Sequence, residues 1–134
     1  MSEEGFVQIA LDDAKEPEVA PEGAYDLVID QATWYTGKTS GKKSIRCIIL
    51  FDGHPEYQPI FHYVSIPNEN DDSEMVGKKL LMVKRFLTLF GVPFDGSGFN
   101  VDDLPGQRAL CNVQQENDGV NPASNKIAVP RMVD

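Results

Sequence analysis

The chain has 134 residues, a formal net charge of -9 at pH 7, and a content of 41% hydrophobic and 25% charged residues, which is typical of an ordinary globular domain. This length suffices for one hydrophobic core and is too short for two. The longest apolar runs, at 47–51 and 80–83, are far below the roughly 20 residues that a membrane-spanning helix needs, so no membrane span is expected.

The negative charge is concentrated at the N-terminus. Residues 1–30 carry a net charge of -8, whereas residues 31–134 sum to -1. Residues 1–22 are acidic, contain two prolines and have few large apolar groups, so they are predicted to form a flexible arm before one folded domain at 23–134. This N-terminus lacks the basic and apolar regions of a secretory signal, so a cytoplasmic location is expected. Cys47 and Cys111 lie in strand-like apolar runs and are expected to be reduced core residues.

Three strands are predicted in the first half of the folded region. Alternation that begins at Gly23 predicts a half-buried strand running toward Tyr35. Residues 36–43 are rich in Gly, Ser and Thr and predict a turn, and 44–52 and 57–66 predict the second and third strands. Pro59 indicates an edge strand or a bulge, because proline cannot donate a ladder hydrogen bond.

One helix is predicted after the third strand. Its apolar stripe at helical spacing comprises Met75, Leu80, Val83, Leu87 and Phe90. Ser73 is the expected N-cap, and Gly91 and Pro93 are expected to end the helix. Residues 107–115 and 125–132 then predict the fourth and fifth strands.

The order of these elements favours a mainly β fold. Three strands, a helix and two strands within about 110 residues predict a five-stranded OB-fold barrel with one α-helix between strands 3 and 4. An open sheet with one helix has the same order and remains an alternative.

The segment WYTGKTSGKKS, at 34–44, contains a Gly-Lys-Thr sequence like the end of a phosphate-binding P-loop. The glycine that such a loop needs five positions upstream is replaced by Ala32, and a predicted strand follows instead of a helix. The P-loop interpretation is therefore excluded.

The same basic segment fits a surface that binds single-stranded DNA. OB-folds bind oligonucleotides on the face of strands 2 and 3 and on the loops between strands 1 and 2 and strands 4 and 5. Alternation puts Tyr57, Phe61 and Tyr63 on the outer face of the third strand and Arg46 beside them on the second. Bases stack on exposed aromatic rings while lysines follow the phosphates. The candidate DNA-binding residues are Trp34, Tyr35, Lys38, Lys42, Lys43, Arg46, Tyr57, Phe61, Tyr63 and Arg131. A plain hairpin turn with packed aromatics is the alternative interpretation.

Four segments resemble the small single-stranded DNA-binding proteins of tailed bacteriophages and prophages. They are EGAYDLVIDQATWYTGKTSGKKSIRCIILF (22–51), KLLMVKRFLTLFGVPFD (79–95), DDLPGQRALCNVQQEN (102–117) and NKIAVPRMV (125–133). The resemblance covers about 22–132. It implies an OB-fold that coats and protects single-stranded DNA during phage replication or recombination, in the bacterial host cytoplasm, without catalysis or a cofactor. Such proteins commonly carry a C-terminal acidic tail, whereas the acidic segment of this chain is N-terminal.

Other functions are not indicated by the sequence. The two histidines have no partners at metal-ligand spacing and no nucleophile motif accompanies them, so no enzyme, metal or cofactor is expected. The alternative function is a non-enzymatic phage structural or protein-interaction module on a small β-barrel. Exposed aromatics beside Lys42, Lys43 and Arg46 favour DNA, whereas a broad apolar patch without bases favours a protein partner. The sequence leaves open whether copies assemble into a homo-oligomer and which phage replication or recombination proteins bind.

Overall fold

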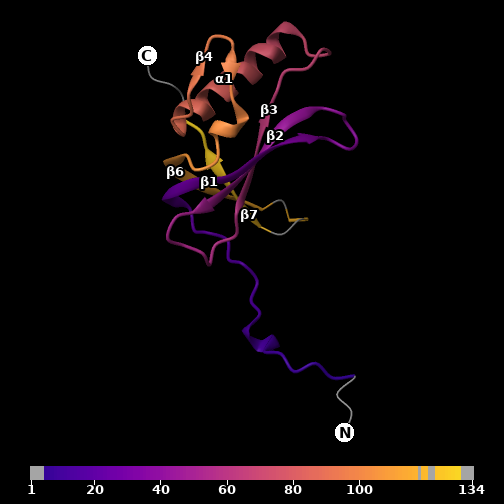
Figure 1. Ribbon diagram of the computed structural model, residues 1–134, viewed down its shortest axis with the longest axis vertical. Helices are drawn as coiled ribbons and strands as arrows, with labels where there is room; N and C mark the ends of the chain where they lie inside the picture. The colour runs from indigo at the N-terminus through magenta and orange to yellow at the C-terminus, as the bar shows by residue number, and fades with distance from the viewer. Residues whose placement is uncertain (1–4, 118, 121–122, 131–134) are drawn as a thin grey trace.

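A computed structural model describes residues 5–117, 119–120 and 123–130. Figure 1 shows one layer of long strands with a helix packed at one end. The main elements are β1 (Gly23–Thr36), β2 (Lys43–Phe51), β3 (Ile60–Ser65), α1 (Ser73–Leu89), β6 (Arg108–Glu116) and β7 (Ser124–Ala128). A short hairpin of β4 (Phe94–Asp95) and β5 (Gly98–Phe99) and two 3-10 turns, at Leu11–Asp13 and Val101–Asp103, complete the described elements.

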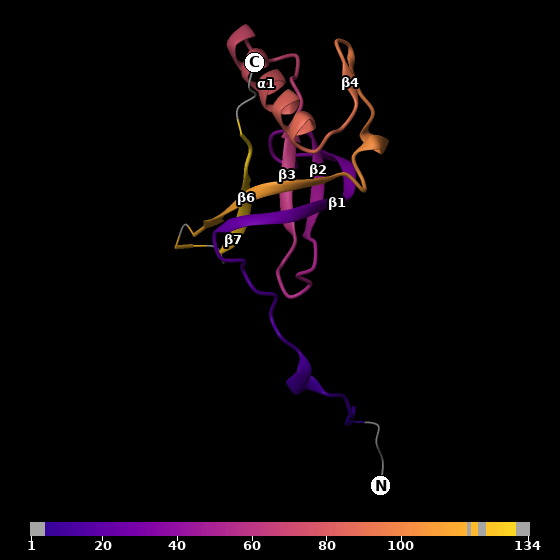
Figure 2. The same cartoon turned by 90° about the vertical axis from the view of Figure 1, so that its left-hand side faces the viewer.

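The five long strands form one antiparallel sheet in the order β3-β2-β1-β6-β7. The sheet is strongly coiled, as Figure 2 shows by the direction of β6, which runs across that of β2 and β3. The coiling brings the two edge strands, β3 and β7, near each other, but in the part of the chain that the structure describes no ladder joins them. The predicted mainly β fold with one helix after the third strand is confirmed, and the sheet is not closed into a barrel.

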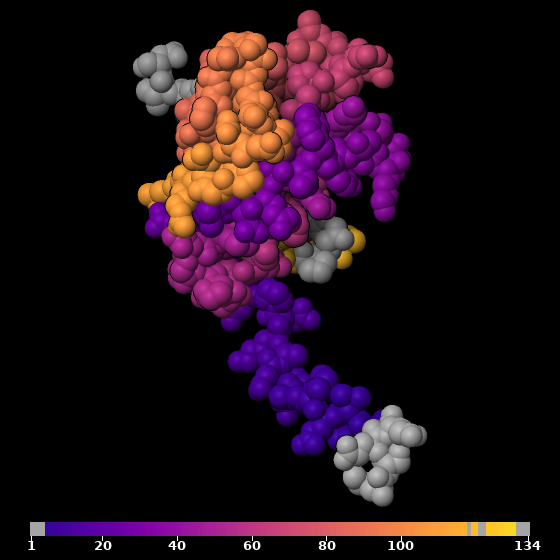
Figure 3. Space-filling view, viewed as in Figure 1, coloured from indigo at the N-terminus to yellow at the C-terminus, as the bar shows by residue number. Residues whose placement is uncertain are grey.

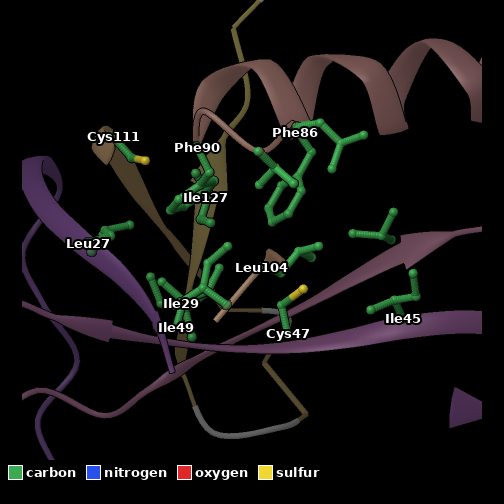
Figure 4. Packing of buried hydrophobic residues seen from close by; sticks show 14 of the residues in the cluster. Leu27, Ile29, Ile45, Cys47, Ile49, Phe86, Phe90, Leu104, Cys111 and Ile127 are labelled. Carbon is green, nitrogen blue, oxygen red and sulfur yellow. The ribbon is translucent and has the colours of Figure 1, made fainter. Parts of the chain in front are cut away.

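The core lies between the inner face of this sheet and α1 (Figure 4). Strict alternation buries every second residue of β2, so Ile45, Cys47 and Ile49 are inaccessible to solvent, as the pattern predicts. Burying a large aliphatic side chain contributes roughly 1.5 to 3 kcal/mol. Both cysteines are free, and burial raises the pKa of Cys47 to about 12 and that of Cys111 to about 11.

The ends of α1 are determined by local sequence. The Asp72 carboxylate accepts a hydrogen bond from the Met75 backbone N–H at 2.8 Å, so Asp72 is the N-cap and the prediction of Ser73 is wrong by one residue. At the other end Gly91 has φ +66°, and the Val92 N–H donates to the Leu87 carbonyl at 2.9 Å. The predicted stop at Gly91 is confirmed, because glycine adopts this backbone conformation without strain.

Only the C-terminal half of α1 packs into the core. Val83, Leu87 and Phe90 are buried as predicted, and Phe86, absent from the predicted stripe, is buried with them. Met75 and Leu80, by contrast, are 44% and 55% exposed, so their assignment to the buried stripe is wrong. The reason is tertiary, since the N-terminal half of the helix extends beyond the end of the sheet (Figure 2).

The structure divides the N-terminal range at residue 18. The Glu18 N–H donates to the Glu56 carbonyl at 2.9 Å, Ala20 is fully buried, and the Ala20 N–H donates to Asn125 Oδ1 at 2.8 Å. Residues 5–17 instead extend away from the body (Figures 1 and 3), and among the described residues no hydrogen bond or ion pair joins them to it. Among the described helices, none combines the length and apolarity that crossing a membrane requires.

Candidate nucleic-acid interface

The outer face of β1, β2 and β3 carries aromatic side chains and an arginine. Thr33, Arg46 and Tyr63 are paired across the three strands and form one row. Residues directly opposite one another in antiparallel strands lie on the same face of the sheet. The neighbouring row contains the buried Ile45, so the row of Arg46 lies on the outer face. Tyr35 and Phe61 lie two residues away along their strands and share the same face. The predicted outward orientation of Arg46, Phe61 and Tyr63 is therefore confirmed.

Tyr35 reaches this face because β1 contains a bulge. Ile29 pairs with Ile49 and Gln31 with Ile48, so Asp30 has no partner in the ladder. Unbroken alternation from the buried Ile29 would turn Tyr35 inward. The extra residue reverses the alternation, since a shift of one residue exchanges the faces of a strand.

Tyr35, Arg46, Phe61 and Tyr63 form what we name the aromatic–arginine cluster. The rings of Tyr35 and Tyr63 are 5.4 Å apart between centroids, and Arg46 Cζ lies 5.8 Å from the Tyr35 centroid, within cation–π range. Phe61 and Tyr63 are 55% and 46% exposed. Within the described chain Arg46 forms no ion pair, and its Nε has no hydrogen-bond partner. The cluster thus combines accessible aromatic rings with a guanidinium group whose charge no carboxylate neutralises.

Three lysines lie on the turn next to the cluster. The Gly37 N–H donates to the Lys42 carbonyl and the Gly41 N–H to the Gly37 carbonyl, both at 2.9 Å, which closes the predicted turn. Gly41 has φ +68°, a conformation that favours glycine. Lys38, Lys42 and Lys43 are exposed, and none forms an ion pair with a described residue. The β1–β2 hairpin therefore carries three lysines that form no ion pair with a described acid.

An acid lies near one side of this basic turn. Lys79 Nζ donates to Asp71 Oδ2 at 2.7 Å, and this hydrogen bond, with one from the Asn68 backbone, lowers the pKa of Asp71. The charge of Lys42 adds a smaller electrostatic contribution in the same direction. Asp71 is therefore ionised at neutral pH, and it forms its ion pair with Lys79 and not with a lysine of the turn.

Two predicted residues lie apart from the cluster, and a third is outside the described residues. Trp34 is 60% exposed, but it pairs with the buried Ile45 and so lies on the opposite face, beside a shallow hollow of about 640 Å³. Tyr57 precedes β3 and packs against Phe51, with ring centroids 5.2 Å apart, so its predicted place on the outer face is wrong. Arg131 lies outside the described residues.

Sequence reasoning missed an apolar continuation of the cluster. Ile48 pairs with Phe61 and Leu50 with Val28 on the outer face, where all but Phe61 are half-buried. Leu110, farther along the sheet on β6, is 66% exposed. The alternation of β2 already indicated that Ile48 and Leu50 point outward, whereas their alignment with Phe61 and Val28 depends on the register.

His62 belongs to the core and not to the candidate interface. Its ring stacks on Phe86 with centroids 4.6 Å apart, and burial lowers its pKa to about 4, so it is neutral at pH 7. His62 is therefore a packing residue of the core. Across the described residues, no three His, Cys, Asp or Glu side chains converge in a way that could hold a metal ion.

The cluster presents rings and a positive charge on the outer face, and the adjoining turn adds Lys38 and Lys42, whereas Lys43 shares the opposite face with Ile45. Comparisons of the chain with protein-family models and with curated proteins find no match.

Proposed function

We propose that the protein binds single-stranded DNA without sequence preference on the outer face of β1, β2 and β3. In this proposal it coats and protects the strand in phage-type replication or recombination, as in the phage proteins that its sequence resembles. The aromatic–arginine cluster carries the proposal, because exposed rings lie beside an arginine, three lysines lie on the adjoining turn, and no described acid forms an ion pair with any of these four cations. This is the combination used for sequence-independent binding of single strands.

The fold is proposed to be a partly open OB barrel. The helix follows the third strand, and the edge strands β3 and β7 approach each other without pairing. In an OB-fold the second and third strands and the loop between strands 1 and 2 contact oligonucleotides. The cluster and the lysine turn occupy the corresponding strands and loop, which supports the proposed function.

Each part of the surface has a distinct physical role. Bases stack on Phe61 and Tyr63, and stacking on an aromatic ring contributes about 1 to 3 kcal/mol per base. Arg46 donates hydrogen bonds to a phosphate while its planar group lies over Tyr35. The lysines replace counterions along the backbone, which makes the affinity fall with salt. The net charge of -9 does not oppose this, because binding responds to the local field and most of the excess charge lies in residues 1–30.

The test is fluorescence anisotropy of a labelled oligothymidylate with the wild type and the double variant Arg46→Gln/Tyr63→Ala. We expect salt-sensitive binding by the wild type and an affinity loss of at least tenfold in the double variant. Trp34→Ala is the matched control, because Trp34 is an equally exposed aromatic residue on the same hairpin but on the other face. Circular dichroism establishes that each variant is folded.

Two results would reject the proposal. Absent binding by the wild type at low salt would exclude the DNA function and favour the protein-interaction module. A loss in Trp34→Ala equal to that in the double variant would exclude the assignment to one face of the sheet.

A further inference from the structure

The N-terminal arm carries an apolar segment that the body of the same chain does not cover. Phe6, Val7, Ile9 and Leu11 are 75%, 71%, 62% and 70% exposed. We name residues 6–11 the apolar arm segment. Single exposed apolar residues are common on protein surfaces, but four large ones within six residues form a contiguous patch of the kind that marks an interaction site.

A groove of matching character lies between α1 and the β4–β5 hairpin. Its volume is about 550 Å³, within the range of ligand-binding pockets. We name it the helix–hairpin groove, and its apolar lining comprises Ile66, Leu80, Val83, Leu87, Phe94 and Phe99. Leu80 and Phe94 are 55% and 41% exposed. The groove therefore leaves large apolar side chains of α1 and of the β4–β5 hairpin accessible to solvent.

Acids flank the arm segment, and one lysine lines the groove. The arm segment is flanked by two acids on each side, at 3–4 and 12–13. Lys84 lines the groove and forms no ion pair with a described residue. Asp95, the one acid among the described lining residues, already accepts hydrogen bonds from Ser97 Oγ and from the backbone N–H groups of Ser97 and Gly98. The described lining residues of the groove thus include one charge of each sign, and Lys84 is the one with which the acids beside the arm segment can pair.

The arm and the groove lie at opposite ends of the molecule. In Figures 1, 2 and 3 the arm leaves the body at the end far from α1 and the β4–β5 hairpin. Residues 5–17 span at most roughly 40 Å when fully extended, so the arm can reach a neighbouring copy. A segment at one end and its complement at the other make a head-to-tail contact, which forms rings or open chains of copies.

We infer that the apolar arm segment of one copy docks into the helix–hairpin groove of a second copy. The contact buries the exposed side chains of Phe6 and Ile9 against Leu80 and Phe94, and it places the flanking acids near Lys84. This inference does not rest on DNA binding, because it uses neither the outer face of the sheet nor the lysine turn.

The test is sedimentation velocity of the full chain over a range of concentrations. We expect the mean mass of the wild type to rise with concentration. The arm variant Phe6→Ser/Ile9→Ser and the groove variant Leu80→Ser/Phe94→Ser should each remain monomeric. Leu110→Ser is the matched control, because it changes an equally exposed apolar residue on the outer face of the sheet, and it should assemble like the wild type.

Mixing the two variants distinguishes a head-to-tail contact from other assemblies. The groove variant keeps an intact arm and the arm variant keeps an intact groove, so an equimolar mixture should form dimers that do not grow further. A fluorescent peptide of residues 1–17 should bind the arm variant saturably and bind the groove variant at least tenfold more weakly.

Three outcomes would overturn the inference. One is a wild type that stays monomeric at every concentration. Peptide binding would not rescue the inference in that case, because the arm would then dock into the groove of its own chain or onto another partner. Another is an assembly that neither variant weakens. The third is a mixture of variants that stays monomeric although both proteins have the circular dichroism of the wild type.

Discussion

The two faces of the five-stranded sheet are built by the same strands but have different compositions. The inner face of β2 presents Ile45, Cys47 and Ile49, all inaccessible to solvent, whereas the outer face presents Arg46 and Ile48 between them. Burial of the inner residues stabilises the folded state. The outer face as a whole keeps aromatic rings and positive charge accessible to a ligand. Adjacent residues in one strand therefore have separate roles. Those on the inner face stabilise the fold, and those on the outer face, in our proposal, bind the ligand.

The largest expected effect comes from the adjacent pair Ile48 and Ile49, which face opposite sides. We expect Ile49→Ala to lower the free energy of unfolding by about 3 kcal/mol, because it leaves a cavity in the core. Ile48→Ala should cost less than half as much, since Ile48 is only half-buried. Urea unfolding of both variants measures this. Equal losses would contradict the assignment of the two faces.

A second effect concerns pH and the inner face. Burial lowers the pKa of His62 to about 4 in the folded state, below the value of about 6.5 expected when unfolded. The unfolded state therefore takes up this proton first, so the stability present above pH 6.5 is lost as the pH falls toward 4. The loss from His62 should reach roughly 2 kcal/mol at pH 4.5.

His62→Phe tests this, because phenylalanine can keep the stacking on Phe86 but does not titrate. Urea unfolding at pH 7 and pH 4.5 should show a smaller loss for His62→Phe than for the wild type. The comparison of the two proteins cancels the titration of carboxylates such as Asp71 and Asp95. The same acid sensitivity in both proteins would show that His62 is not responsible.

A third effect is confined to the outer face. Phe61→Ala should weaken binding to oligothymidylate by about 1 to 3 kcal/mol, or roughly five- to hundredfold, because one stacking ring is lost. Its effect on the free energy of unfolding should stay below about 1 kcal/mol, since the side chain is 55% exposed. Anisotropy and urea unfolding measure the two quantities. A large loss of stability without a loss of affinity would reverse the proposed division of roles.

The smallest effect is expected at the lysine turn. Lys38→Gln and Lys42→Gln should each reduce the slope of log affinity against log salt by about 0.7, the contribution of one phosphate contact on a single strand. The affinity at low salt should fall only a few-fold. Titrations at several salt concentrations give the slopes. Slopes equal to that of the wild type would place the DNA backbone away from the turn.

Much of the fold could be predicted because its signals are local. Alternation in β2 identified the buried face, the Gly, Ser and Thr residues at 36–43 identified the turn, and Gly91 identified the end of the helix. The outward direction of Arg46, Phe61 and Tyr63 followed from the same period of two. These features depend on a few neighbouring residues and on steric rules that hold in any fold.

Other features could not be predicted because they depend on distant contacts. Met75 and Leu80 belong to the same predicted apolar stripe as Val83 and Leu87, yet only Val83 and Leu87 are buried. Alternation within 57–66 predicts that Tyr57 points outward from a strand. Tyr57 instead lies before β3 and packs against Phe51. In both cases the local pattern is present in the sequence. The exposure of each side chain is determined by where that residue lies relative to the rest of the chain.

Local patterns were therefore enough to predict the five main strands, the 36–43 turn and the helix, because backbone sterics and the alternation of apolar groups act over short distances. The bulge at Asp30, which turns Tyr35 toward Arg46 and Trp34 away from it, depends instead on how β1 pairs with β2. Long-range contact likewise places Ala20, which is fully buried and whose N–H donates to Asn125, 105 residues away. The register between strands and the contacts between remote segments are set by packing the whole core at once, which no local pattern encodes.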